Sequence, residues 1–177
     1  MKKIVVAILT MLVCLSFCSC TSFEKHGIEK YSPANSDVEI TVFLPEDDFL
    51  TEYEYIEGDY HFYRYEEILF APELERTILY LKYDDKTYQD AKKCVMENDY
   101  LSDNSVEEYN GYVFYNVDYN DRGYHPWEFR RFAYKDANNT LLFIGFYECA
   151  DYPNVSDFND WGAFLEEYYG EWYDFSQ

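Results

Sequence analysis

Basic residues are scarce in this chain of 177 residues, which has 14 lysines and arginines against 35 aspartates and glutamates. The formal net charge is −21 at pH 7. Such a polyanion repels a phosphate backbone, so the composition argues against nucleic acid as a partner. Cations, basic proteins and neutral polar ligands remain as partners, and the acidic residues would also keep the protein soluble.

Histidine is rare as well. Three histidines are present, His26, His61 and His125, and no His/Cys cluster has the spacing of zinc ligands. The chain also lacks a Gly-x-Ser-x-Gly elbow and a phosphate-binding glycine loop. His125 with Asp121 could orient a catalytic base, but an exposed loop histidine fits the same pattern. These absences argue against a nucleophilic enzyme.

Long hydrophobic runs are missing after residue 17. The one apolar run, residues 4–17, follows Lys2 and Lys3 and precedes Ser19 and Cys20. It is shorter than the roughly 20 residues that cross a bilayer. A basic start, a short apolar centre and a small residue near its end are typical of an export signal.

The end of this signal resembles the lipobox of bacterial lipoproteins, in which the cysteine is lipidated and becomes the first mature residue. Cys20 follows the small Ser19, whereas Cys18 follows the bulky Phe17. We therefore favour Cys20 as the lipidated residue and leave Cys18 open. The resemblance implies a signal peptide over residues 1–19 and a small exported lipoprotein, held by its lipid at the outer face of a bacterial membrane. A plain secretory signal is the alternative.

The rest of the chain divides into two parts. Residues 20–36 are polar and aperiodic, which predicts a flexible tether, and residues 37–177 are long enough for a single domain with a core. Cys94 and Cys149 remain in that domain. In an exported protein they can form one disulfide or stay as buried thiols, and both options are open.

Strand patterns occupy most of the domain. Val38, Ile40 and Val42 alternate with polar residues, as in a half-buried strand. The tyrosine-rich stretch 53–65 predicts two short strands around a turn at 57–59. Further strands are expected at 77–83, 111–119, 129–135 and 140–149, the last two joined by an Asx-rich hairpin loop.

Two helices are predicted. The run Asp84-Asp85-Lys86-Thr87 supplies several candidate N-caps for a helix at about 85–100, in which Tyr88, Ala91 and Val95 share one face. A second helix at about 157–173 carries an aromatic stripe, formed by Trp161, Phe164, Leu165, Tyr168 and Trp172. The fold class is therefore α+β, with a mostly antiparallel β-sheet covered by two amphipathic helices on one face or on opposite faces.

This layout resembles the Mog1/PsbP-like sandwiches, some of which are bacterial lipoproteins. The resemblance rests on an early strand that ends at Leu44-Pro45, a mid-chain helix and an aromatic C-terminal helix. It implies a binding or assembly factor rather than an enzyme, and it assigns no functional residue.

Aromatic residues are abundant, with 21 Tyr, 14 Phe and 3 Trp. That number exceeds the need of one small core, so several rings should be partly exposed. Exposed rings beside carboxylates suit a sugar, which stacks on them, or a protein, which buries them as anchors. Tyrosine also packs well within strands. The main candidate binding residues are Tyr124, Trp127, Tyr152 and Trp172, with Tyr53, Tyr55, Tyr60, Tyr63 and Tyr169 as further candidates.

Oxygen ligands gather in one loop. Asp118, Asn120 and Asp121 stand beside a glycine, as in a calcium site, although Arg122 and Phe129 break the EF-hand pattern. An ordinary Asx turn is the alternative, and the acidic triplet at 46–48 has the same two interpretations. Calcium is the one cofactor that the sequence suggests.

These features together predict a membrane-anchored, non-enzymatic binding module for a protein or a glycan. One alternative is an immunity or inhibitor lipoprotein that blocks a basic protein, for which salt-sensitive binding is expected. Another is a hydrolase with paired carboxylates about 5–9 Å apart.

Overall fold

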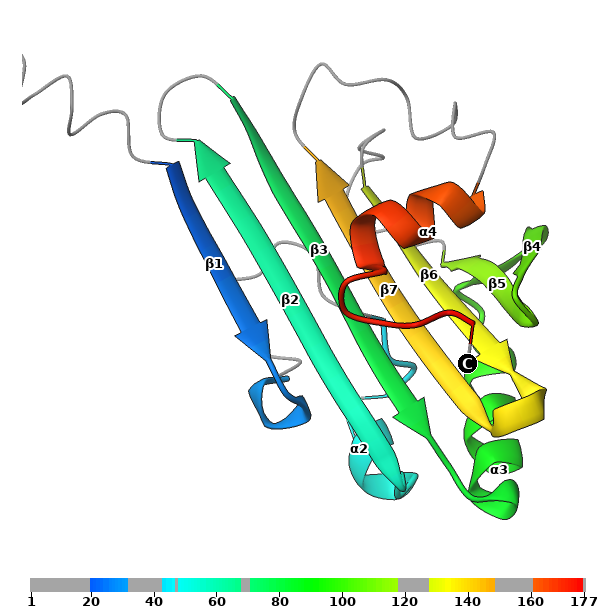
Figure 1. Cartoon of the computed structure of the whole chain (residues 1–177). Coiled ribbons are helices and arrows are strands. Elements are labelled where there is room, and N and C mark those ends of the chain that lie inside the picture. The colour runs from blue at the N-terminus through cyan, green and yellow to red at the C-terminus, as the bar shows by residue number, and fades with distance from the viewer. Residues whose placement is uncertain are drawn as a thin grey trace, which may run out of the picture.

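The computed structural model describes residues 20–31, 43–46, 48–67, 71–117, 128–148 and 161–176. Seven strands form one antiparallel sheet in the order β1-β2-β3-β7-β6-β5-β4 (Figure 1). The strands are β1 (Cys20–His26), β2 (Glu57–Glu67), β3 (Ala71–Lys82), β4 (Leu101–Tyr109), β5 (Tyr112–Val117), β6 (Glu128–Lys135) and β7 (Thr140–Glu148). The α-helices are α2 (Phe49–Glu52), α3 (Asp85–Met96) and α4 (Trp161–Tyr169). The predicted α+β fold is confirmed.

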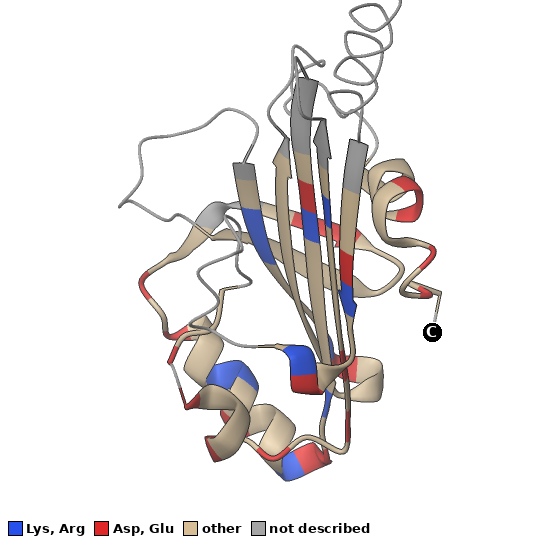
Figure 2. Ribbon diagram, turned by 90° about the vertical axis from the view of Figure 1, so that its left-hand side faces the viewer, with Lys and Arg blue, Asp and Glu red and all other residues tan. Residues whose placement is uncertain are grey.

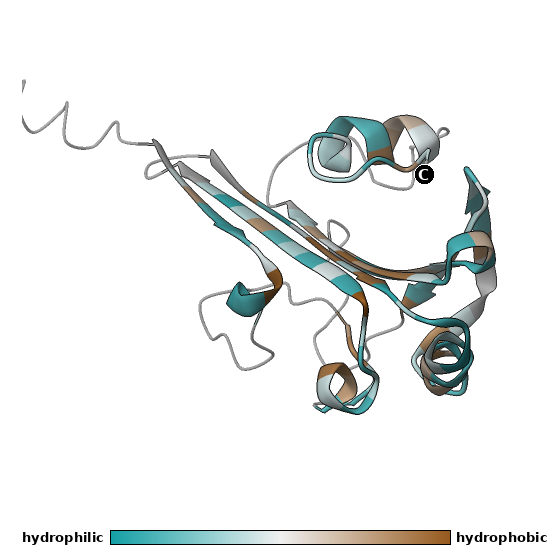
Figure 3. Ribbon diagram, turned by 60° about the horizontal axis from the view of Figure 1, so that its bottom comes forward, coloured by the Kyte–Doolittle hydropathy of each residue, from teal (hydrophilic) through white to brown (hydrophobic). Residues whose placement is uncertain are grey.

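Helices lie on both faces of the sheet. Alternate residues of the central strands face opposite ways, so Leu79 and Phe143 contribute to one core and Ile78 and Ile144 to another. Helices α2 and α3 cover the first face and α4 covers the second (Figure 3). Charged positions of both signs occur along strands and helices (Figure 2). Within the described ranges, no helix has the length and hydropathy that crossing a bilayer requires.

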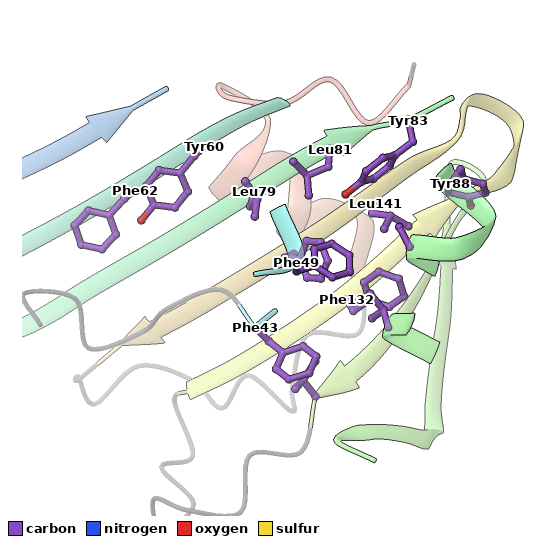
Figure 4. Packing of buried hydrophobic residues seen from close by; sticks show 14 residues of the cluster. Phe43, Phe49, Tyr60, Phe62, Leu79, Leu81, Tyr83, Tyr88, Phe132 and Leu141 are labelled. Atoms are coloured by element: carbon purple, nitrogen blue, oxygen red, sulfur yellow. The ribbon is translucent and has the colours of Figure 1, made fainter. Parts of the chain in front are cut away.

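The core under α2 and α3 is rich in aromatic rings (Figure 4). Tyr88, Ala91 and Val95 are fully buried on one side of α3, as their spacing predicted. Asp84 caps this helix by accepting hydrogen bonds from the backbone N–H groups of Lys86 and Thr87, at 3.0 and 2.9 Å. Those bonds hold the pKa of its carboxyl below the usual range. Asp84 is therefore the residue that caps the helix among the predicted candidates, and the predicted buried face is confirmed.

The second core lies under α4. Phe164, Leu165 and Tyr169 are fully buried, and the Tyr169 hydroxyl donates a hydrogen bond to the Gly145 carbonyl at 2.8 Å. The helix ends at Tyr169, earlier than predicted, and Trp172 follows in the C-terminal segment. That segment returns across the same face of the sheet, where Phe175 is buried.

Several local predictions differ from the structure. The turn predicted at 57–59 is wrong, because β2 runs without interruption from Glu57 to Glu67. Part of the expected tether, residues 20–26, forms β1, which pairs with β2 along its whole length. The backbone hydrogen bonds that the edge of β2 offers outweigh the polar local sequence there. The strand predicted around Val38, Ile40 and Val42 lies outside the described residues.

Candidate functional site

Three polar side chains converge where β1 ends beside β2. His26, the last residue of β1, is the direct cross-strand partner of His61 in β2. Asp59 lies two residues before His61, so its side chain projects from the same face of the sheet. The register of two strands therefore places two imidazoles and a carboxylate together.

The geometry of this group is compact. Each histidine places its Nε2 atom 3.1 Å from Oδ2 of Asp59. The two imidazole centroids are 4.0 Å apart, with ring planes 39° from parallel. His61 is the most enclosed member, with 14% of its side chain exposed, against 42% for Asp59 and 61% for His26. The group therefore opens toward solvent on the His26 side.

Burial dominates the protonation of His61. It lowers the pKa of this imidazole, and the nearby His26 acts in the same direction, whereas the Asp59 carboxylate opposes the change. The Nδ1 atom of His61 is buried and makes no hydrogen bond with the part of the chain that the structure describes. The neutral form of His61 is thus favoured, with Nε2 directed at Asp59.

An aromatic and cationic layer adjoins this group. The indole of Trp172 stacks on His61, and the Arg76 guanidinium lies 4.3 Å from the indole centroid. Arg76 also lies 4.8 Å from the ring of Tyr63, its cross-strand neighbour in β2. It donates hydrogen bonds to the Tyr168 carbonyl and, at 2.6 Å, to the Glu171 carboxylate. These contacts join β2 and β3 to the end of α4 and to the segment that follows it.

The structure describes only some of the predicted site residues. Trp172 is half-buried and belongs to this layer. Cys20 is the first residue of β1, opposite Glu67, and nothing is described of its side chain. The other main candidates lie outside the described residues: Tyr124, Trp127, Tyr152, Asp118, Asn120 and Asp121.

Most described aromatic rings pack inside the protein. Tyr60 and Tyr169 are buried, which removes them as contact residues, while Tyr53, Tyr55 and Tyr63 are half-buried. Exposed rings do occur, as predicted, and Phe23 and Tyr100 are the most exposed described examples. Tyrosine abundance is therefore mainly a property of the two cores.

Two further groups are weaker candidates for a functional site. Glu46, Asp48 and Glu52 bring three carboxylates together around α2, but all three are exposed. Cys94 is a free thiol on α3, and burial raises its pKa. Its possible disulfide partner, Cys149, lies outside the described residues.

Sequence reasoning missed the His26–Asp59–His61 group. The alternation of Asp59 and His61 places both on one face of a strand, and that signal was available. The position of His26 was not, because it depends on a strand pairing 35 residues away along the chain. Comparison of the chain with protein-family models, curated proteins and solved structures finds no match.

Proposed function

We propose that the protein is an exported lipoprotein, anchored through Cys20 to the outer face of a bacterial membrane, which acts as a non-enzymatic binding module for a protein or a glycan. One observation carries the proposal. On the face of β2 and β3 next to α4, the half-buried rings of Tyr63 and Trp172 both contact the Arg76 guanidinium. In Figure 1, α4 crosses β6 and β7 and does not extend over β1 and β2.

The chemistry of this face suits a protein partner. Tyrosine, tryptophan and arginine are the residue types that contribute most to binding energy at protein interfaces. Here Arg76 is held by two rings, a carbonyl and Glu171, so little side-chain freedom remains to be lost on binding. The Trp172 indole already contacts His61 and Arg76, which reduces the ring area left for a sugar. Among the two ligand classes, a protein is therefore favoured.

The position of Cys20 is compatible with an anchor close to the domain. β1 begins at Cys20 and ends at His26, and a strand rises about 3.3 Å per residue. A lipid on Cys20 would hold one end of the sheet at the membrane surface, and the polar group at His26 would lie about 20 Å away along β1. Such an arrangement favours a partner that is itself at the cell surface.

The two alternatives have less support. An immunity-type protein would need free acidic side chains on one face, but several described carboxylates are paired with cations, as in Arg76–Glu171, Lys92–Asp136 and Arg131–Glu107. A glycoside hydrolase needs one carboxyl whose pKa is raised by an enclosed site. The clustered carboxylates at Glu46, Asp48 and Glu52 are exposed instead.

A photo-crosslinking amino acid at position 63 tests the proposal in cells of the native host. Tyr100 is the matched control position, because it is an exposed tyrosine on the part of the chain leading into β4. We expect a discrete protein adduct from position 63 and none from position 100. In parallel, thermal unfolding is measured against a panel of oligosaccharides, since a ligand at 100 times its Kd adds about 2.7 kcal/mol. No adduct at position 63 and no shift with any sugar would overturn the proposal.

A further inference from the structure

We propose that His26, Asp59 and His61 form a binding site for Zn²⁺ or another divalent first-row transition metal. The proposal does not depend on the binding function above, because its three ligand side chains differ from Tyr63, Arg76 and Trp172 and its ligand is a metal ion. It concerns the open end of the β1–β2 pair, where the three ligand atoms lie within 4.8 Å of one another.

Strand register builds this site. His26 and His61 are directly paired, and Asp59 and His61 share a face of β2. The backbone continues the pairing just beyond His26, since the Gly27 N–H donates to the Tyr60 carbonyl at 2.9 Å. All three ligands are therefore fixed by a hydrogen-bonded ladder rather than by a free loop.

The distances suit a tetrahedral ion. Zinc binds histidine nitrogen and carboxylate oxygen at about 2.0–2.2 Å, so neighbouring ligand atoms around it are about 3.3–3.4 Å apart. The two Nε2–Oδ2 separations are each 3.1 Å. A small rotation of the side chains would open these contacts enough to admit an ion. Three protein ligands would leave a fourth position for water or for a group from a partner.

The ligand types select the metal. Two imidazoles and one carboxylate suit zinc, copper, nickel or iron, whereas calcium and magnesium prefer oxygen ligands alone. The exposed carboxylates of Glu46, Asp48 and Glu52 form an all-oxygen group elsewhere in the same chain. That group provides an internal comparison, since it should not discriminate for transition metals.

The surroundings favour occupancy. Trp172 stacks on His61 with ring planes 11° from parallel, which restrains the orientation of the imidazole. The greater exposure of His26 and Asp59 lets an ion enter from solvent. The net charge of −21 raises the local concentration of cations around the protein.

Occupancy would also have a structural consequence. His26 belongs to β1 and the other two ligands belong to β2, so an ion would fasten the edge strand to the sheet. Amide hydrogens of β1 should then exchange more slowly in the presence of zinc. This readout separates a bridging ion from an ion held by scattered surface carboxylates.

The test uses the full chain, purified in detergent and stripped of metal with a chelator. Calorimetric titration with zinc chloride should give one site per chain, and a large excess of calcium chloride should not compete for that site. His26→Asn should weaken zinc binding by roughly 100-fold or more, beyond the typical effect of losing an outer-shell partner. Glu46→Gln is the matched control and should retain the affinity of the unaltered protein. Cobalt(II) should give the strong visible absorption of a four-coordinate ion, and His26→Asn should abolish it.

His26 is mostly exposed, so His26→Asn should fold normally, and equal unfolding temperatures without metal will check this. Zinc affinity that is unchanged in His26→Asn would overturn the proposal. So would zinc binding that is lost in Glu46→Gln, or calcium that displaces cobalt(II) from the site as readily as zinc does. Failure of the crosslinking experiment at position 63 would leave these outcomes unaffected.

Discussion

The indole of Trp172 stacks on the imidazole of His61, with ring centroids 5.3 Å apart. One ring comes from the segment after α4 and the other from β2, so the contact fastens the C-terminal segment to the sheet. Arg76 strengthens this attachment through its contact with the same indole and its hydrogen bond to Glu171. The attachment also restrains the side chain that is the most enclosed of the proposed metal ligands.

Trp172→Ala should destabilise the protein by about 2 kcal/mol. This is less than the ~3–5 kcal/mol typical of truncating a fully buried tryptophan, because Trp172 is only half-buried. Urea unfolding measures the change, and Trp172→Phe, which keeps a ring against His61, should lose less than half as much. Identical unfolding curves for Trp172→Ala and the unaltered protein would show that the C-terminal segment is not held by this contact.

An ion pair within the sheet gives the second prediction. Arg64 in β2 lies opposite Glu75 in β3, with Nη1 3.0 Å from Oε1, and the Glu75 side chain is fully buried. Glu75→Ala should cost about 3 kcal/mol, because it removes the buried partner of a largely buried cation. Combining Glu75→Leu with Arg64→Met should recover most of that loss in chemical denaturation. A single variant as stable as the unaltered protein would mean that the pair contributes nothing.

The sequence predicted the fold class because the central elements carry strong local patterns. The strands at 129–135 and 140–149 correspond to β6 and β7, with the Asx-rich turn between them. In this turn Asn139 adopts a left-handed conformation, with φ of 57°, which asparagine tolerates well. Helix α3 could also be predicted, because its N-cap and its buried face depend only on residues that are close together in the chain.

Other strands were missed because their own sequences are polar, and pairing with a neighbouring strand stabilises them. β4 was missed because its sequence, LSDNSVEEY, is polar and does not alternate. It is an edge strand whose pairing with β5 supplies the hydrogen bonds. The polar residues of β1 predict a tether for the same reason. Gly58 favoured a turn, yet it lies inside β2, opposite Leu81.

The candidate sites also combine local features, which the sequence shows, with contacts that depend on the sheet. Trp172 could be singled out from composition, but its stacking partner could not, since His61 and Trp172 are far apart in sequence. The proposed metal ligands come together through the register of β1 against β2. The spacing of the histidines in the sequence does not reveal this register. The sequence therefore shows which residue types are present. Which of their side chains come together depends on how the strands pair in the sheet.

The lipid anchor gives the third prediction. Cys20→Ser should abolish lipid attachment and move the protein from the detergent phase to the aqueous phase in phase-separation assays. Cys18→Ser is the matched control and should remain in the detergent phase. Mass spectrometry of the N-terminal peptide identifies the modified residue. The reverse pattern would assign the anchor to Cys18, and an aqueous protein in every case would indicate a plain secretory signal.

The fourth prediction concerns alkaline pH. Burial raises the pKa of the Tyr60 phenol from 10.0 to about 12, and the buried Glu75 carboxylate acts in the same direction. The unfolded chain therefore loses this proton at lower pH than the folded protein does. The stabilising contribution of neutral Tyr60 is complete below pH 10 and falls as pH rises toward 12, by about 1.4 kcal/mol per pH unit.

Tyr60→Phe tests this link between burial and proton affinity, because phenylalanine keeps the ring and has no proton to lose. In urea unfolding above pH 10, the free energy of unfolding should fall more steeply for the unaltered protein than for Tyr60→Phe, by about 1.4 kcal/mol per pH unit. Below pH 10 the two proteins should show parallel behaviour. Equal slopes above pH 10 would mean that the Tyr60 hydroxyl reaches water in the folded state, and the core against β2 would then be more open than its burial indicates.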